Sequence, residues 1–157
     1  MEYFGITLFI VAMVLLVVPV VRNWLKRRHD FAEVKKTVEN EKDKYMFLID
    51  RDFKVKATNF YELNPELKDG QPEVLGNVLH CETGCESGLC GTGIACQTCP
   101  VRMILTNSFK QRRDFESVTA TMRLYNKEHQ VNEKQVKVDG KLVYLGYVPH
   151  FIVNVSE

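Results

Sequence analysis

The first 21 residues contain the longest apolar run of the chain. Residues 3–21 read YFGITLFIVAMVLLVVPVV and carry no charge. About twenty apolar residues can cross the roughly 30 Å hydrocarbon core of a membrane as a helix. A cleaved signal peptide has positive charge before its apolar run and small residues after it. Here Glu2 precedes the run and a bulky basic segment, residues 22–28, follows it. The pattern therefore predicts a retained transmembrane helix over residues 1–21.

Basic residues are concentrated directly after this run. Residues 22–36 carry six basic and two acidic residues, a net charge of +4, whereas residues 37–157 carry −2. The positive-inside rule places such a flank in the cytoplasm. We therefore expect a single-pass protein of the inner (cytoplasmic) membrane, with its N-terminus outside, its soluble domain in the cytoplasm and membrane lipid as one partner. The balanced overall charge indicates no nucleic acid partner.

Apolar residues recur at helical spacing between residues 22 and 44. A thin apolar stripe among the charged residues consists of Leu25, Phe31, Val34 and Val38. This stripe predicts a juxtamembrane helix over residues 22–44. A solvated connector and a short dimeric coiled coil both fit the stripe. The coiled coil would make a second copy of the chain a partner.

Strand-like patterns occupy both ends of the remaining chain, residues 45–157. An apolar run at 45–49 and an alternating run at 53–57, separated by Asp50-Arg51-Asp52, predict a β-hairpin. Towards the C-terminus we expect strands over 118–124, 136–138 and 141–155. Asp139-Gly140, a strong hairpin signal, is expected to form the turn between the last two.

The middle of the chain has a different character. Residues 60–95 hold six of the nine glycines, which predicts short helical turns and loops. Pro100 suits the first position of a helix, and the apolar face that follows predicts a helix over 100–109. Two strands, a helical middle and three strands define an α+β fold, a five-stranded antiparallel sheet with helices on one face. The predicted core residues are Phe47, Ile49, Val55, Ile104, Leu105, Val118, Ala120, Val143 and Ile152.

All five cysteines fall between Cys81 and Cys99, in the order Cys81, Cys85, Cys90, Cys96 and Cys99. Stable disulfides are rare in the cytosol, so clustered cysteines there more often bind metal or perform redox chemistry. Thiolates are ligands for zinc and iron–sulfur clusters, and structural zinc takes four ligands. The predicted metal ligands, for zinc or an iron–sulfur cluster, are Cys81, Cys90, Cys96 and Cys99. Cys85 is expected to be peripheral.

Two other interpretations of the cysteines stay open. Cys96-Gln97-Thr98-Cys99 precedes a predicted helix, whose dipole lowers a thiol pKa, and so could be a redox-active dithiol. Inert core cysteines or a disulfide are the third reading. Neighbouring residues leave further alternatives: Arg102 could stabilise a thiolate site or lie at the surface, and His80 could bind metal or be a loop histidine. His150 is expected to be a packed histidine.

The order of elements and several local sequences resemble the PAS domain. Residues 48–55 with Asn59 are similar to the opening PAS hairpin and its following asparagine. Three further segments resemble a cysteine-bearing subgroup of bacterial sensory PAS domains. They are residues 76–81, Cys90-Gly91, and Cys96 to Cys99 with Arg102. The resemblance covers about residues 45–155 and implies a sensory or protein-interaction module. Cys85 is additional to the pattern of four cysteines.

The sequence as a whole predicts a membrane-anchored cytoplasmic PAS-like domain with a four-cysteine site. Its parts are an anchor (1–21), a juxtamembrane helix (22–44) and the domain (45–157), with the cysteine cluster at 81–99. We recognise no output domain within residues 1–157 and therefore expect a protein partner, a transmitter or a membrane complex. No catalytic residue set is present, and we do not expect an enzyme. The alternatives are a small membrane-bound iron–sulfur electron carrier, a redox-active dithiol protein and a zinc-stapled structural subunit.

Overall fold

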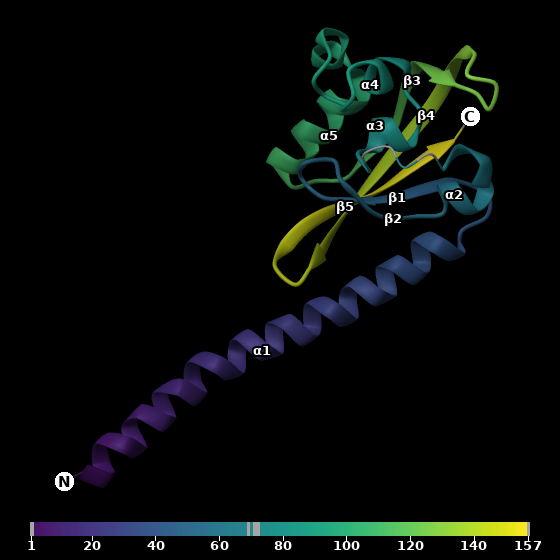
Figure 1. Cartoon of the computed structure of the whole chain (residues 1–157). Helices are drawn as coiled ribbons and strands as arrows, with labels where there is room; N and C mark the ends of the chain where they lie inside the picture. Colours follow the sequence, from purple (N-terminus) through teal and green to yellow (C-terminus); the bar gives the residue numbers. More distant parts are fainter. Residues whose placement is uncertain (1, 69, 71–72, 157) are drawn as a thin grey trace.

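The computed structural model describes the backbone of residues 2–68, 70 and 73–156, and the side-chain environment from residue 11 onward. A long helix, α1 (Glu2–Asn40), extends away from a folded domain that contains the rest of the chain (Figure 1). The two helical segments predicted over 1–21 and 22–44 are therefore one continuous helix, which includes Pro19 and ends at Asn40.

The predicted transmembrane segment lies partly outside the described residues, because no side chain before residue 11 is placed. Within the part of the chain that the structure does describe, no helix is both long and apolar enough to span a membrane. The side chains of residues 11–21 are exposed, among them Leu15 and Leu16 at 69% and 68%.

Five strands form one antiparallel sheet in the order β2-β1-β5-β4-β3. The strands are β1 (Tyr45–Ile49), β2 (Val55–Thr58), β3 (Phe115–Tyr125), β4 (Val131–Leu145) and β5 (Val148–Ser156). Because β5 pairs with β1 on one side and β4 on the other, the C-terminal strand is central and the two ends of the domain sequence are joined. The predicted five-stranded antiparallel sheet is confirmed.

The predicted turn at Asp139-Gly140 is wrong. β4 runs through both residues, and the turn comes later, at Gly146, where φ is +65°. Gly140 instead lets the Phe115 ring lie against its backbone, since a Cβ there would collide with that ring. The Asp139 carboxylate accepts a hydrogen bond from the Ser117 amide (2.7 Å) at an irregularity in β3. Asp139 and Gly140, which the sequence predicts to form a turn, therefore lie within β4 and contact residues of β3.

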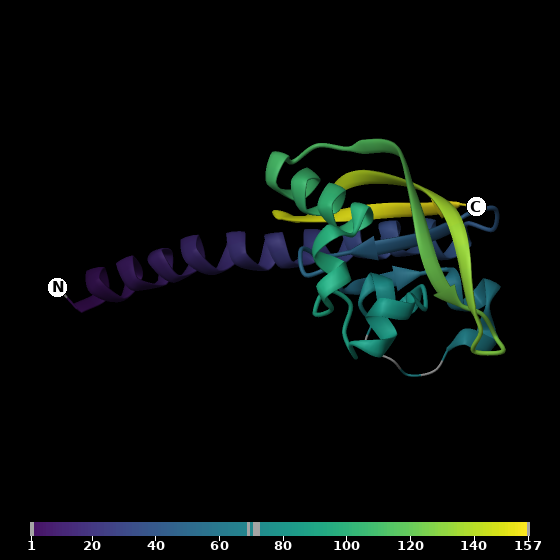
Figure 2. The same cartoon turned by 90° about the horizontal axis from the view of Figure 1, so that it is seen from above.

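Short helices and one longer helix connect β2 to β3. They are α2 (Phe60–Leu63), the 3₁₀ helix η1 (Pro65–Leu67), α3 (Leu75–Val78), α4 (Glu82–Glu86), the 3₁₀ helix η2 (Ile94–Thr98) and α5 (Pro100–Gln111). The predicted helix at 100–109 is confirmed and extends two residues further. Figure 2 shows α5 and the short helices gathered on one side of the sheet, with α1 on the other side.

The main core lies between the sheet and the short helices. Its buried members include the predicted Phe47, Ile49, Val55, Leu105 and Ala120, and Ile104 and Val118 pack against it partly buried. Phe109 from α5 meets Phe151 from β5 with ring centres 4.6 Å apart. This edge-to-face contact joins helix and sheet at the centre of the core.

The second face of the sheet is covered by α1. Val38 is fully buried with Leu48 and Leu145, and Phe31 and Val34 pack beside them. The short helices and α5 lie on one face, as predicted, while the apolar stripe of the juxtamembrane segment packs on the other face, where no helix was predicted. Val143 and Ile152, predicted for the main core, belong to this second cluster and are partly buried.

Candidate functional site: a cavity lined by four cysteines

The predicted ligand cysteines come from four short segments. Cys81 immediately precedes α4, Cys90 lies in the loop after it, Cys96 is in η2, and Cys99 immediately precedes α5. Cys96 is buried and the other three are partly buried. Their backbones follow one another in tight turns, since the Cys99 amide donates to the Cys96 carbonyl and the Cys81 amide to that of Gly76.

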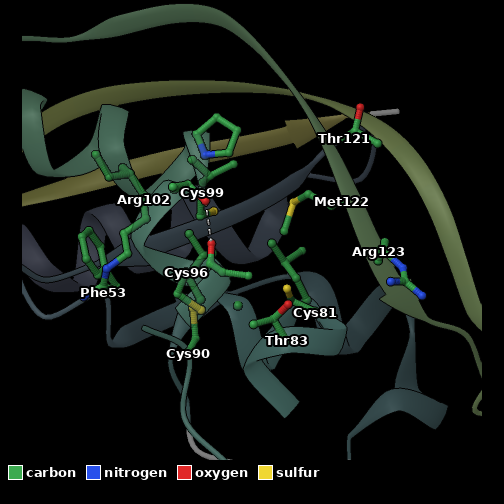
Figure 3. Close-up of a pocket in the computed structure, with 18 residues that line it drawn as sticks. Phe53, Cys81, Thr83, Cys90, Cys96, Cys99, Arg102, Thr121, Met122 and Arg123 are labelled. Carbon is green, nitrogen blue, oxygen red and sulfur yellow. Dashed lines mark hydrogen bonds between the residues drawn. The ribbon is translucent and has the colours of Figure 1, made fainter. Parts of the chain in front are cut away.

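These four cysteines line one cavity of about 260 Å³ between the short helices and β3. Figure 3 shows Cys81 and Cys90 towards the α4 side, Cys99 at the start of α5, and Met122 on the strand that closes the cavity. Most of the remaining wall is apolar, from Phe53, Leu75, Leu79, Val101 and Leu105. The structure thus brings all four predicted cysteines together, while Cys85 is not part of the wall.

In the described part of the chain, no three side chains of histidine, cysteine, aspartate or glutamate are arranged to hold a metal ion. Sulfurs that share one zinc lie roughly 3.5–4 Å apart, given Zn–S bonds of about 2.3 Å. Convergence of the four sulfurs on one metal therefore stays a prediction.

Asn77 fixes the loop that carries Cys90. Its side chain is fully buried; its Oδ1 accepts from the Cys90 amide (2.7 Å), and its Nδ2 donates to the carbonyls of Gly84 and Gly88 (3.3 and 3.4 Å). A buried amide with partners for both ends holds a unique geometry. Sequence analysis noted Asn77 only as part of the PAS resemblance and did not find this role.

Cys90 packs closely against two glycines. A Cβ at Gly76 would collide with the Cys90 sulfur, and a Cβ at Gly84 would lie 3.3 Å from Cys90 Cβ. Glycine is needed here for the close approach of the two segments. The helices α3 and α4 can therefore lie close enough to bring Cys81 and Cys90 to the same cavity.

Arg102 and Arg123 contribute positive charge to the wall, and Arg102 lies at the start of α5. Its guanidinium lies over the Phe53 ring, 4.7 Å from the ring centre, and against Gly91. Phe53 has a φ of +60°, which a bulky residue adopts only at some cost. Arg102 is partly buried beside the thiols and so is not simply a surface arginine.

Burial raises the pKa of the Cys81 and Cys90 thiols, that of Cys90 to about 11. The other cysteines of the cavity raise both values further, while the backbone amide of Gly84 opposes the shift at Cys81 and that of Gly76 at Cys90. Without a positive partner, both groups are therefore protonated at neutral pH. This environment is unlike that of an exposed, reactive thiolate.

The cysteine segment is also attached to the edge strand β3. Arg123 pairs with Glu82 at 3.0 Å, and the Tyr125 hydroxyl donates to Glu86 at 3.4 Å. Cys81 and Leu124 form an isolated antiparallel bridge. A displacement of α4 would therefore reach β3 directly.

The two histidines considered from sequence lie outside the cavity wall. His80 is buried, with its Nε2 2.7 Å from the Leu67 carbonyl. His150 is buried in β5, its Nδ1 3.1 Å from the Val148 carbonyl, as expected of a packed histidine. Sequence analysis also missed Phe53 and Met122 as wall residues, because their roles depend on how the loop segments fold onto the sheet.

No protein-family model and no curated protein matches the chain. The solved structures that are similar to it include two PAS domains and one protein complex. The PAS domain of a Desulfitobacterium hafniense protein is 13% identical over 74% of this chain and 93% of its own, with a TM-score of 0.45. A PAS domain from a two-component sensor histidine kinase is 11% identical over 83% and 97%, with a TM-score of 0.41.

The third structure is the Escherichia coli DhaR(N)–DhaL complex. It is 14% identical over 98% of this chain and 44% of that chain, with a TM-score of 0.46. At such scores these likenesses carry no argument. The strand pairing and order of elements in this chain give an α+β fold with one five-stranded antiparallel sheet.

Proposed function

We propose that the protein is a sensory or protein-interaction module, not an enzyme, and that the cysteine cavity is its input site. The observation that carries the proposal is the gathering of Cys81, Cys90, Cys96 and Cys99 around one cavity of about 260 Å³. These residues come from four separate segments, each shaped by its own turns and glycine contacts. Soft thiol donors in that number suit a bound metal centre.

We propose an iron–sulfur cluster as the bound group, with a single zinc ion as the alternative. Both take cysteine thiolates as ligands, and a cluster, which places several metal atoms between its thiolates, would occupy the cavity that the four cysteines line. Arg102 in the wall would balance part of the negative charge of a thiolate-bound cluster.

The output passes through the elements that the cysteine segment contacts. Binding at the cavity would reposition α4, which is attached to β3 through Arg123 and Tyr125. β3 is an edge strand, and the part of its outer edge away from the Leu124–Cys81 bridge can pair with another chain. A protein partner, a transmitter or membrane complex, would read this edge or the outer face that carries α1.

The domain is proposed to be held at the inner membrane by the apolar run of residues 3–21, with residues 22–157 in the cytoplasm. The support is the uncharged sequence of that run, the exposure of its described side chains, and the basic flank that follows. A reporter fused after Glu157 should be active only in the cytoplasm. Periplasmic activity would contradict this orientation.

Purification of the full chain in detergent without oxygen or chelator tests the nature of the bound group. We expect iron and inorganic sulfide in equal amounts and a broad visible absorption that bleaches on reduction. If the purified protein contains zinc and no iron, the bound group is a mononuclear zinc site and not a cluster. Protein without any metal, even after reconstitution with iron and sulfide, would contradict the metal proposal.

A further inference from the structure

The turn between β4 and β5 lies beside α1. The Gly146 amide donates to the Asp30 carboxylate at 3.4 Å, and a methyl group at Gly146 would lie 3.2 Å from Asn23 Oδ1 and 3.4 Å from Arg27 Cβ. Figure 1 shows this hairpin extending out of the domain along α1, towards the N-terminal end of the helix. The turn is therefore level with residues 23–30, directly after the apolar run.

Exposed aromatic and basic side chains surround this turn. Tyr147, at its tip, is 83% exposed, and Trp24 and Leu25 on α1 are each 54% exposed. Arg28 lies over the Trp24 ring, 4.8 Å from its centre. Residues 11–29 contain no acidic residue; their four basic residues, all exposed, are Arg22, Lys26, Arg27 and Arg28.

Two features of this surface indicate a membrane as its partner. Tyrosine and tryptophan are enriched at the membrane–water interface, where the ring is apolar and its polar atom meets water. Lysine and arginine next to a membrane-spanning segment attract anionic headgroups. Here both kinds of side chain lie between the folded domain and the exposed apolar residues 11–21, as a headgroup region would.

We propose that Tyr147 and residues 22–28 together bind the headgroup region of an anionic membrane, so that the β4–β5 turn is a second membrane contact. The inference rests on the anchor proposed above for residues 3–21. With contacts from both α1 and the turn, the domain is held in one orientation to the bilayer. Its edge strand β3 and its cysteine cavity then face a partner in a fixed direction.

Tryptophan reporters in the full chain test this proposal, because the protein has a single tryptophan, Trp24. The first variant combines Trp24→Phe with Tyr147→Trp. The matched control combines Trp24→Phe with Glu128→Trp, an exposed position in the turn at the opposite end of β4, roughly 40–50 Å away along the strand. Each protein is reconstituted into phosphatidylcholine vesicles with or without phosphatidylglycerol, with lipids brominated near the headgroup as quenchers.

We expect the tryptophan at position 147 to be quenched several-fold more strongly than the one at 128, and more strongly with phosphatidylglycerol present. Replacing Lys26 and Arg28 by Gln should remove that lipid preference. If Trp24 of the wild type is quenched but the tryptophan at 147 is not, the anchor stands and the second contact is overturned. If neither tryptophan is quenched, the proposed anchor and the proposed second contact are both overturned. Shielding at 147 that appears only as protein concentration rises in detergent would assign the surface to a second copy and overturn the proposal.

Discussion

Asn77 connects the cysteine loop to the core through both ends of its amide. The backbone N–H of Cys90 and the carbonyls of Gly84 and Gly88 have the Asn77 side chain as their partner in a buried position. The four cysteines thus depend on a neighbour that holds their loop in place. At this scale the fold of the loop is set by one amide and by the glycines that make room for Cys90.

The variant Asn77→Ala should lower the free energy of unfolding by about 1–3 kcal/mol, because it leaves buried backbone groups without partners. Urea unfolding of the full chain in mild detergent measures the change. The matched control is Asn107→Ala, at an exposed position of α5, for which we expect little change. Equal effects of the two substitutions would show that the Asn77 bonds contribute nothing specific.

The four cysteines that line the cavity could be singled out from sequence, but their arrangement could not. The spacing of Cys81, Cys90, Cys96 and Cys99 shows that four thiols could act together. Their placement around one cavity depends on Gly76 and Gly84 in α3 and α4, and on Met122 from β3. Such contacts join residues distant in sequence, and no local pattern encodes them.

α1 is both a candidate anchor and a structural part of the domain. Its C-terminal half covers the outer face of the sheet through Phe31, Val34 and Val38. A thin apolar stripe at helical spacing predicts that one side of a helix is buried. It does not predict whether that side packs against a second copy of the helix or against a sheet. Asp139-Gly140 shows the same limit, because a good turn pair can be used within a strand when a ring needs the space.

Truncation of Val38 should loosen α1 from the sheet. Val38 is fully buried against Leu48 and Leu145, so Val38→Ala removes two buried methyl groups and should cost about 1–3 kcal/mol. Hydrogen exchange of residues 31–40 should increase. Leu25→Ala, at a half-exposed position of the same helix, is the control and should leave exchange there unchanged; an equal increase in both variants would contradict the packing role.

At the scale of the whole molecule, β5 joins the parts of the domain. It pairs with β1 and β4, its Phe151 meets α5, and its Ile152 faces the α1 cluster. The overall α+β order was predictable because strand and helix periodicities are local. The coverage of both faces was not, because it depends on where α1 packs in three dimensions.

Acid should destabilise the domain through His150. Burial lowers its pKa below the ordinary value of 6.5, with smaller effects from Arg27 and Lys56 in the same direction, while the Val148 carbonyl and Asp50 oppose them. The unfolded chain then binds more protons than the folded one, so stability rises with pH. The contribution is complete above pH 6.5 and is lost as the pH falls towards the lower folded pKa.

The free energy of unfolding, followed from pH 7.5 to 5, should therefore decrease in the wild type and change less in His150→Gln. His129→Gln, in an exposed turn, should behave as the wild type. A wild-type stability that is constant or rises on acidification would contradict the assignment.

The central claim, that four cysteines around one cavity hold the input group, is tested most directly by the iron and sulfide bound per chain in a set of single cysteine-to-serine variants. The full chain is purified in detergent without oxygen. We expect Cys81→Ser, Cys90→Ser, Cys96→Ser and Cys99→Ser each to lose most bound iron and sulfide, since a thiolate ligand is removed and metal binding is coupled to local folding. Cys85→Ser, outside the cavity wall, should retain the wild-type content. Loss of iron in Cys85→Ser with retention in Cys81→Ser would contradict the account.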